Sequence, residues 1–286
     1  MKNLKKILIA FLIIPLTIFS QQKEKDSIID KPQRPAFESS TIINNQTNVL
    51  YTKNTLEIQM SHRFGLINGG ENDLAGFWAP SNIRIGLSYT ILDRVTIGYG
   101  TTKFDRLQDF NLKVALLRQT RSDKIPVSIT YFGNATINAK KKENFNLKQD
   151  RYSYFNQIII ARRFSPKFSL QIAPSISHYN LVETFMENDR IAVAVGGRYK
   201  ISSNTSIMFD YSQPITQWDD PDRPDVDFNL PGISLGVEFG TSGHAFQLFI
   251  TNYNGIVPQK NYMFNQNDFF KGDFLIGFNI TRLYNF

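Results

Sequence analysis

Few side chains in this sequence of 286 residues could do chemistry, because it contains three histidines and no cysteine. The lack of cysteine excludes a lipid-modified N-terminus, a thiolate metal site, a disulfide framework and c-type haem attachment. His244 and Ser242 have the spacing of a Ser–His pair in an outer-membrane lipid hydrolase, but no Asn or Asp completes the set. Ser177 and His178 are adjacent, so in a strand they would point to opposite faces. We therefore predict no catalytic residues, and we place all three histidines, including His62, at interfacial or turn positions.

Two clusters of charge could bind ions. An acidic cluster within residues 219–227 could collect calcium, but it lacks the Gly and the terminal Glu of a known calcium loop. A basic run from Lys140 to Lys142 could contact lipopolysaccharide phosphates, because clustered cations attract such groups. Solvated surface charge is the simpler explanation of both clusters, and we predict neither a metal site nor a cofactor. The acidic residues are Asp219, Asp220, Asp222, Asp225 and Asp227.

The first twenty residues have the order of a signal peptide. Three lysines precede an apolar stretch from Ile7 to Phe19, and Ser20 is a small residue before a polar run. The apolar stretch is too short to cross a bilayer core of about 30 Å as a helix. We therefore predict that residues 1–20 are a cleaved signal peptide, and we exclude them from the fold.

The rest of the chain shows the two-residue period of β-strands. No later segment approaches twenty consecutive apolar residues, so only strands closed into a barrel could span a membrane. Residues 56–64 and 83–90 alternate between apolar and polar side chains, and ten further segments show the same or a weaker alternation. The 24 Phe and 12 Tyr suit aromatic girdles that face lipid. The formal charge of +7, part of which lies in the signal peptide, requires no nucleic-acid partner.

The connections between these segments alternate between short and long. Five short links rich in turn-forming residues, such as Leu92-Asp93 and Ser202-Ser203-Asn204, alternate with six long links. Bacterial barrels have short periplasmic turns and long outer loops. Six loops and five turns require twelve strands and place both termini in the periplasm. We predict an all-β, up-and-down antiparallel transmembrane barrel of about twelve strands over residues 55–286.

The end of the chain resembles the C-terminal recognition signal of outer-membrane barrels, which has an aromatic final residue and apolar residues at alternating positions before it. In that family the signal is bound by the barrel-assembly machinery, which the resemblance therefore implies as a partner during biogenesis. Arg282 departs from the pattern, because it falls on the lipid-facing side, although a long cationic side chain can extend to the interface at small cost. The matching residues include Phe278, Ile280, Tyr284 and Phe286.

Four short motifs carry a second resemblance; they are Arg34-Pro35-Ala36-Phe37-Glu38, His62-Arg63-Phe64-Gly65, Asn82-Ile83-Arg84 and Asn111-Leu112-Lys113. On these motifs the mature chain resembles an uncharacterised family of outer-membrane β-barrels from Bacteroidota. The resemblance implies a barrel in the outer membrane, in contact with lipid and lipopolysaccharide. It implies no activity and transfers no catalytic residues.

The predicted strands place charged side chains inside the barrel. Cations outnumber anions among them by six to three, which would favour anionic solutes in a water-filled bore, as rings of Arg and Lys do in anion-selective pores. Pairing of the charges across the lumen, which would close a small barrel, explains them equally well. The predicted lumen-lining residues are Glu57, Arg63, Arg84, Arg94, Lys113, Arg198, Lys200, Asp210 and Glu238.

Residues 21–54 precede the first predicted strand. Their first part is charged, whereas residues 35–48 carry one charge, Glu38, among enough Ile, Phe and Asn to dock on a surface. This segment could plug the periplasmic mouth, contact a periplasmic partner or remain an unstructured tether. Arg34, Phe37 and Glu38 are the residues expected to act in the first two cases.

The sequence thus favours a passive or gated channel in the outer membrane for small solutes, and the excess of predicted lumen cations extends this expectation to anionic ones. The alternative is a closed structural or scaffold barrel, which paired lumen charges and an N-terminal segment filling the bore would favour. An outer-membrane lipid hydrolase using Ser242 and His244 ranks third.

Overall fold

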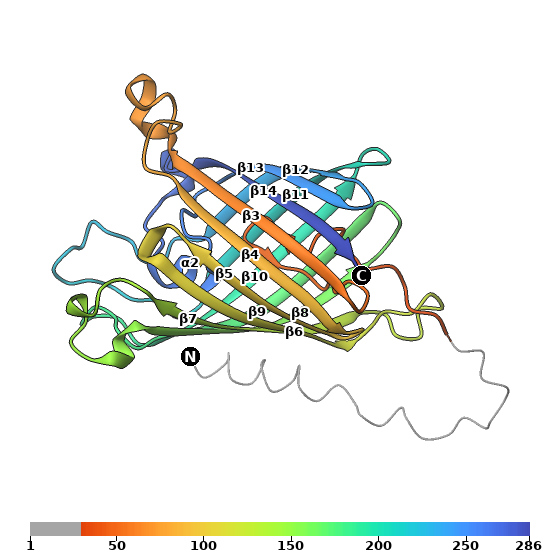
Figure 1. Cartoon of the computed structure of the whole chain (residues 1–286). Coiled ribbons are helices and arrows are strands. Elements are labelled where there is room, and N and C mark those ends of the chain that lie inside the picture. Colours follow the sequence, from red (N-terminus) through yellow and green to blue (C-terminus); the bar gives the residue numbers. More distant parts are fainter. Residues whose placement is uncertain (1–29) are drawn as a thin grey trace, which may run out of the picture. The chain divides into compact units, whose positions relative to one another are not determined.

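The structure, a computed structural model, describes residues 30–286. The predicted signal peptide and the start of the leader lie outside the described residues. Twelve antiparallel strands form a closed barrel in which each strand pairs with its neighbours in the chain and β14 pairs with β3 (Figure 1). This confirms the predicted fold and number of barrel strands. The strands are β3 (Thr55–Leu66), β4 (Asn82–Leu92), β5 (Val95–Thr102), β6 (Leu107–Leu117), β7 (Ser128–Asn138), β8 (Tyr152–Arg163), β9 (Phe168–Tyr179), β10 (Asp189–Lys200), β11 (Thr205–Pro214), β12 (Gly232–Gly240), β13 (His244–Thr251) and β14 (Leu275–Asn285).

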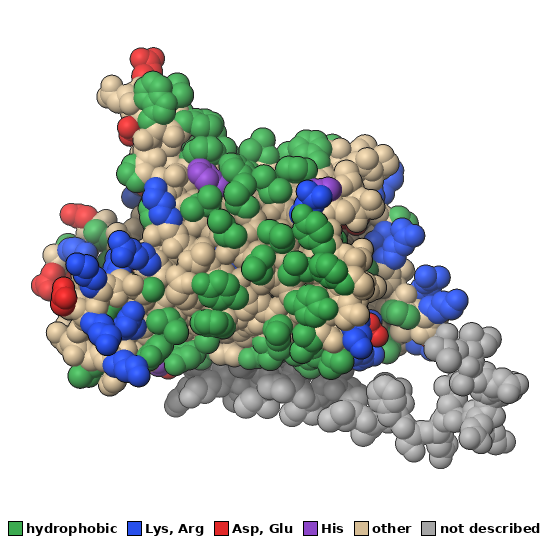
Figure 2. Space-filling view, in the orientation of Figure 1, with side chains coloured by type: hydrophobic (Ala, Val, Ile, Leu, Met, Phe, Trp, Pro, Cys, Tyr) green, Lys and Arg blue, Asp and Glu red, His purple; other side chains and the backbone are tan. Residues whose placement is uncertain are grey.

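The barrel wall follows directly from the alternation of side chains. Leu248, Ile207 and Ile85 are exposed on the outer surface, whereas their neighbours Gln247 and Ser206 are buried inside. Figure 2 shows hydrophobic side chains gathered along the middle of the wall, with Lys and Arg towards its two ends. An apolar outer belt buries its area in lipid rather than in a protein core. Among residues 30–286, no helix is long and apolar enough to cross a membrane.

The two ends of the barrel differ in the length of their connections. One end, here called the turn end, carries five connections, the start of β3 and the C-terminus (Figure 1); four of these connections have two to four residues, and the one from β6 to β7 has ten. The opposite end, the loop end, carries six connections that contain all the helices of the barrel region; five of them have nine residues or more, and the one from β5 to β6 has four. These helices are η2 (Ile67–Asp73), η3 (Phe104–Arg106), η4 (Lys142–Asn144), η5 (Lys148–Arg151), α2 (Pro258–Phe264) and η6 (Phe269–Lys271).

The segment that precedes β3 lies inside the barrel. Its strands β1 (Thr41–Ile42) and β2 (Asn45–Gln46) form a hairpin whose tip is Ile43-Asn44. Residues 36–49 are almost all buried, although no sheet of the wall extends into them. We call residues 36–51 the plug.

A cation placed in the middle of the outer belt tests the membrane-facing surface. Leu248→Arg should lower the free energy of unfolding in lipid vesicles by about 2–4 kcal/mol, because an arginine near the bilayer midplane loses its hydration. Urea titration of the folded barrel, followed by its gel mobility before and after heating, measures the change. Ser242→Arg, in an exposed turn, serves as the control and should change stability by less than about 0.5 kcal/mol. Equal effects of the two changes would contradict the assigned face.

Candidate functional site

The tip of the plug is held by one carboxylate of the wall. Asp210 on β11 accepts hydrogen bonds from the backbone N–H groups of Asn44 and Asn45 at 2.9 and 3.1 Å, and from Nδ2 of Asn45 at 2.7 Å. Opposite, Arg63 on β3 donates to Oδ1 of Asn44 at 2.9 Å. These bonds satisfy backbone groups that would otherwise be buried without partners. They also hold Ile43 at φ 53°, a conformation that is unfavourable for a β-branched residue.

One side of the plug packs on apolar wall residues. Ile42 belongs to a buried cluster with inward-facing residues of β8 to β11, most of which have small or aliphatic side chains. Gly196 on β10 permits this approach, since a Cβ at that position would lie 3.2 Å from Cγ2 of Ile42. Inward hydrophobic residues would be poorly placed in a bore full of water, so this side of the lumen is built for an occupied state. The wall residues include Ile159, Ala161, Ala173, Ala192, Ala194 and Met208.

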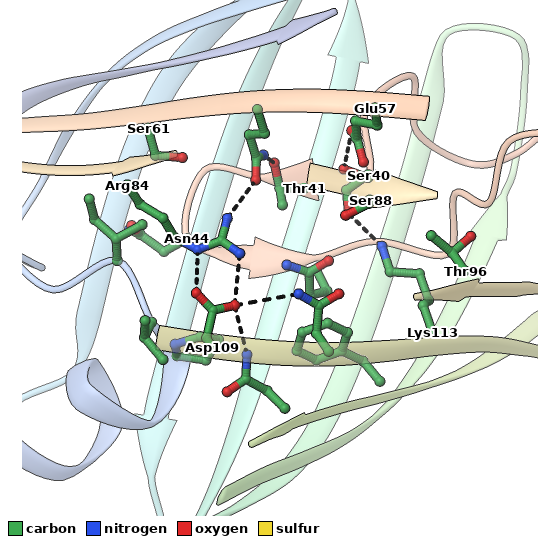
Figure 3. Close-up of a pocket in the computed structure, with 18 of the residues that line it drawn as sticks. Ser40, Thr41, Asn44, Glu57, Ser61, Arg84, Ser88, Thr96, Asp109 and Lys113 are labelled. Atoms are coloured by element: carbon green, nitrogen blue, oxygen red, sulfur yellow. Dashed lines mark hydrogen bonds and ion pairs between the residues drawn. The ribbon is translucent and has the colours of Figure 1, made fainter. Parts of the chain in front are cut away.

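Polar contacts fix the base of the plug near the turn end. Ser39 donates to Glu238 at 2.7 Å, and Ser40 donates to Glu57 at 2.6 Å. The carbonyl oxygen of Ser40 accepts from Nζ of Lys113 at 2.9 Å, so Ser40 lies between a carboxylate and an ammonium group of the wall (Figure 3). Burial, reinforced by the negative charge of Glu57, raises the pKa of Tyr51 well above its usual value. The Tyr51 hydroxyl therefore stays protonated and donates to Glu57 at 3.3 Å.

A second insert enters from the loop end. The connection between β13 and β14 folds inward and brings α2 into the lumen, where the ring of Tyr262 stacks on Phe155 with a centroid separation of 5.5 Å. Nε2 of Gln259 donates to Thr136 on β7 at 2.8 Å. The Tyr262 hydroxyl donates to Oδ1 of Asn45 at 2.6 Å. The two inserts therefore meet inside the barrel, at Asn45 of the plug.

The outer end of α2 is tied to a neighbouring loop by charge. The carboxylate of Asp105 in η3 forms an ion pair with Nζ of Lys260 at 3.2 Å and a second ion pair with Lys140. Burial alone would raise the pKa of Asp105, but the two lysines outweigh it and hold that pKa below its usual value. The carboxylate therefore remains charged at neutral pH. Lys140, from the basic run Lys140–Lys142, is thus partly engaged by this loop contact.

The wall formed by β4, β5 and β6 differs from the apolar side. Three inward positions on β4 and β5 are glycine, and the guanidinium of Arg84 fills the space over two of them, Gly86 and Gly100. Arg84 makes two hydrogen bonds of 2.8 Å to Asp109, which is almost completely buried. A bidentate pair of this kind satisfies both groups away from bulk water.

A small polar cavity lies between this wall and the plug. Its volume is about 50 Å³, enough for a few water molecules, and it extends from Lys113 and Glu57 to the Arg84–Asp109 pair (Figure 3). At the turn end, a hollow of about 240 Å³ opens beside Tyr51 and Thr130. At the loop end, a hollow of about 230 Å³ adjoins Asn82. The central cavity and the turn-end hollow both border β6, and the central cavity also borders β4 and β5.

The predicted lumen residues fall into two groups. Arg94 lies exposed in the turn between β4 and β5, because β5 begins only at Val95. The other eight lie on inward-facing strand positions, with Lys200 at the turn-end mouth. Asp109 and Arg190 are also buried inside, although the sequence analysis does not select them; the alternation of β6 around Phe110 and Leu112 is the signal that could have found Asp109. The inward residues of the predicted set are Glu57, Arg63, Arg84, Lys113, Arg198, Lys200, Asp210 and Glu238.

The charges inside the barrel include more cations than carboxylates. Arg63, Lys113, Arg190 and Arg198 are buried, Arg84 is partly buried and Lys200 lies at the mouth, against four buried carboxylates. The predicted excess of cations is therefore smaller but still present, because Arg94 is exposed while Arg190 and Asp109 lie inside. Of the predicted plug residues, Phe37 is buried, Arg34 is exposed, and Glu38 lies at the mouth beside Arg198. The carboxylates are Glu57, Asp109, Asp210 and Glu238.

The remaining predicted residues lie on the outer surface or in turns. His62 stacks on Phe278 on the lipid-facing side, with a centroid separation of 5.0 Å. His178 contacts Asp189 at 2.8 Å near the loop end, whereas the adjacent Ser177 is buried inside. Ser242 lies in an exposed turn. Within residues 30–286, no group of three His, Cys, Asp or Glu residues is arranged to hold a metal ion. Like Phe278, the residues Ile280, Tyr284 and Phe286 occupy alternate positions of the last strand and its end.

Comparison with known proteins identifies the family. The model of a family described as "Membrane bound beta barrel domain (DUF5777)" matches residues 37–284. The chain belongs to this family. The match includes nearly the whole plug as well as the barrel, so the plug is part of the family domain. None of the curated proteins matches the chain.

Solved structures share the barrel at low sequence identity. The COG4313 outer membrane channel from Pseudomonas putida F1 superposes with a TM-score of 0.51 and 12% identity, over 82% of this chain and 97% of that chain. The NanC porin has a TM-score of 0.49 and 7% identity, over 81% and 99% of the two chains. The KdgM porin has a TM-score of 0.48 and 6% identity, over the same shares. These similarities concern the fold alone, and the family description makes the barrel a membrane-bound one.

The Arg84–Asp109 pair yields a test of the polar wall. Asp109→Asn should lower the free energy of unfolding by about 3–5 kcal/mol, because it leaves a buried guanidinium without its counter-charge. The double change Arg84→Gln with Asp109→Asn should cost less than the sum of the two single changes. Urea titration in lipid vesicles measures all three variants. Additive effects would show that the two side chains do not depend on each other.

The junction of the two inserts can be tested by removing a single oxygen atom. Tyr262→Phe keeps the stacked ring but deletes the hydroxyl that donates to Asn45, and should cost about 1 kcal/mol. Amide hydrogen exchange should rise in residues 41–46, because the tip of the plug loses a contact. Tyr199→Phe, on the exposed outer surface, is the matched control. Unchanged exchange at the plug would argue against the junction.

Proposed function

We propose that the protein is a gated channel for small polar solutes, and that the described state is the closed one. The observation that carries this proposal is the asymmetry of the lumen. The inward residues of β8 to β11 that pack against Ile42 of the plug are mainly Ala, Ile and Met, whereas β4 to β6 carry inward glycines and the Arg84–Asp109 pair and border the central cavity and the 240 Å³ hollow. A solute crossing the barrel would pass between the plug and β4 to β6.

The distribution of hydrogen bonds supports this route. The plug bonds to β3, β11, β12, β13 and β14 through several side chains, including Gln59, Asp210, Glu238, Gln247 and Asn279. Within residues 30–286, one side-chain hydrogen bond joins the plug to β4, β5 or β6, from Lys113 to Ser40. The plug is therefore held by fewer hydrogen bonds on this side than on the side of β3 and β11 to β14.

Two constrictions would close the route. Near the turn end, Tyr51 borders the central cavity and the 240 Å³ hollow, and separates them together with the Lys113–Ser40 contact. Near the loop end, residues 256–258 line the cavity. The same loop is joined to β4 by a hydrogen bond of 3.0 Å from Nδ2 of Asn82 to the carbonyl oxygen of Asn254. Both constrictions belong to inserts rather than to the wall, so they can move while the barrel stays intact.

The proposal includes an orientation and partners. The turn end faces the periplasm after cleavage of a signal peptide, and the last strand, ending at Phe286, engages the barrel-assembly machinery. The loop end faces outward, where Lys141 and Lys142 meet lipopolysaccharide phosphates. The barrel encloses the buried part of the plug, so a periplasmic partner would bind the residues that precede the plug.

A closed scaffold barrel is the second candidate function. It is favoured by the extent of the filling, because both inserts are hydrogen-bonded to each other and to the wall. In that case the lumen serves stability alone, and no change at the constrictions opens a path for ions.

Single-channel conductance in planar bilayers tests the proposal. Tyr51→Ala should raise the conductance or the open probability several-fold over the unchanged protein, because it removes the ring that separates two cavities. Tyr199→Ala, on the lipid-facing surface, is the matched control. Silence from every variant, with heat-modifiable gel mobility showing that each is folded, would leave the scaffold function.

The position of the route can be tested in the same bilayers. The chain has no cysteine, so Ile42→Cys with Gly196→Cys allows one disulfide, between the plug and β10. In the Tyr51→Ala background, oxidation should leave the conductance unchanged, because the plug need not leave β10. Loss of conductance on oxidation would show that the whole plug moves, and would contradict the route along β4 to β6.

A further inference from the structure

The turn-end mouth holds a third cleft, which the route along β4 to β6 does not use. It lies between the plug and the turn ends of β8, β10, β12, β13 and β14, and its volume is about 340 Å³. Pockets for small organic ligands begin at about this size. Phe37, Val49 and Leu283 give it an apolar floor, and Thr241 and Ser242 lie at its edge.

Positive charge dominates the lining of this cleft. Arg34, Arg163 and Lys200 line it together with a single carboxylate, Glu38. Arg163 lies near enough to Arg34 and Arg198 for their charges to repel one another, and near enough to Glu38 to be attracted. Such a cluster of cations costs electrostatic energy unless an anion neutralises it. Within the described residues, Glu38 is the anion that the cleft contains.

Glu38 belongs to the plug rather than to the wall. Its Oε1 lies 2.9 Å from an Nη of Arg198 and 3.8 Å from Nζ of Lys200. The Arg198 side chain is 6% exposed, whereas that of Glu38 is 46% exposed. Arg198 does not itself line the cleft, because its buried guanidinium lies behind the carboxylate of Glu38, which does line it.

Arg198 also connects the cleft to the anchoring of the plug. Its Nε lies 3.4 Å from Glu238, which accepts the hydrogen bond of Ser39 at 2.7 Å. If Glu38 leaves Arg198, the neighbouring residues 37–40 lose one of the contacts that fix them. Replacing Glu38 by another anion at Arg198 would therefore weaken the contacts that hold the base of the plug.

We propose that this cleft binds a small organic anion, whose carboxylate or phosphate group replaces Glu38 on Arg198 and Lys200. Glu38 is an internal competitor for the site, and the apolar floor accepts a body of about the size of a sugar ring. Binding frees the base of the plug and favours the open state. The effect on opening rests on the proposed channel function, whereas the binding site does not.

Isothermal titration calorimetry on the full chain in detergent tests the site without any measurement of conductance. The probe is glucuronate, with glucose as the neutral control. Glu38→Gln should bind glucuronate more tightly than the unchanged protein, because the internal competitor is gone. Lys200→Gln should weaken binding about tenfold, as expected for loss of one charged hydrogen bond. Glu71→Gln, which removes an exposed carboxylate at the loop end, should leave binding unchanged.

The signs of these effects decide the outcome. If Glu38 served only to stabilise the plug, Glu38→Gln would not raise the affinity, and that result would overturn the proposal. Equal binding of glucose would also overturn it, whereas inorganic phosphate binding as tightly as glucuronate would show that the anionic group alone is recognised. Heat-modifiable mobility establishes that each variant is folded. Binding as expected from a protein that never conducts would sustain the site and refute the channel; conductance without binding would do the reverse.

Discussion

The structure depends on one constraint: the backbone polar groups of a chain segment enclosed in a barrel need hydrogen-bond partners there. Asp210 shows the solution most clearly, since its carboxylate accepts two backbone N–H groups and one amide group at the tip of the plug. Buried N–H groups without partners would destabilise the folded state by more free energy than packing of the tip contributes. The polar side chains of the wall are therefore placed as partners for the plug, and they give it one position and one register.

This arrangement gives the lumen two unlike halves. On β8 to β11, small and aliphatic inward residues accept the apolar side of the hairpin, and Gly196 allows Ile42 to approach closely. On β4 to β6, glycine leaves room for the Arg84 side chain, and the paired charges of Arg84 and Asp109 remain next to a polar cavity. A barrel whose only requirement was to be filled would have no need of this difference. The asymmetry is the observation on which the proposed channel function rests.

Some of the interior could be predicted and some could not. The inward direction of residues such as Glu57 and Asp210 follows from the alternation of their strands, and the structure places them inside. Their partners do not follow from it. Asp210 binds Asn44, 166 positions earlier in the chain, and Asn45 meets Tyr262 of a loop insert. No local pattern encodes contacts between segments this far apart, and the sequence analysis gave no sign that α2 folds inward. The prediction that Arg94 lines the lumen was wrong for a different reason, since alternation does not fix the exact residue at which a strand begins.

The sequence by itself determined the class of fold and the number of barrel strands, because alternation and connection length are local properties repeated along the chain. The family followed from a resemblance that four short motifs carry. It also left open whether residues 21–54 plug the barrel. Only the tertiary structure decided that residues 36–51 lie in the lumen, that Arg84 pairs with Asp109, and that a polar cavity lies between the plug and β4 to β6. These features depend on which strands face each other across the closed barrel, and barrel closure brings together residues whose separation in the sequence carries no information about their distance in space.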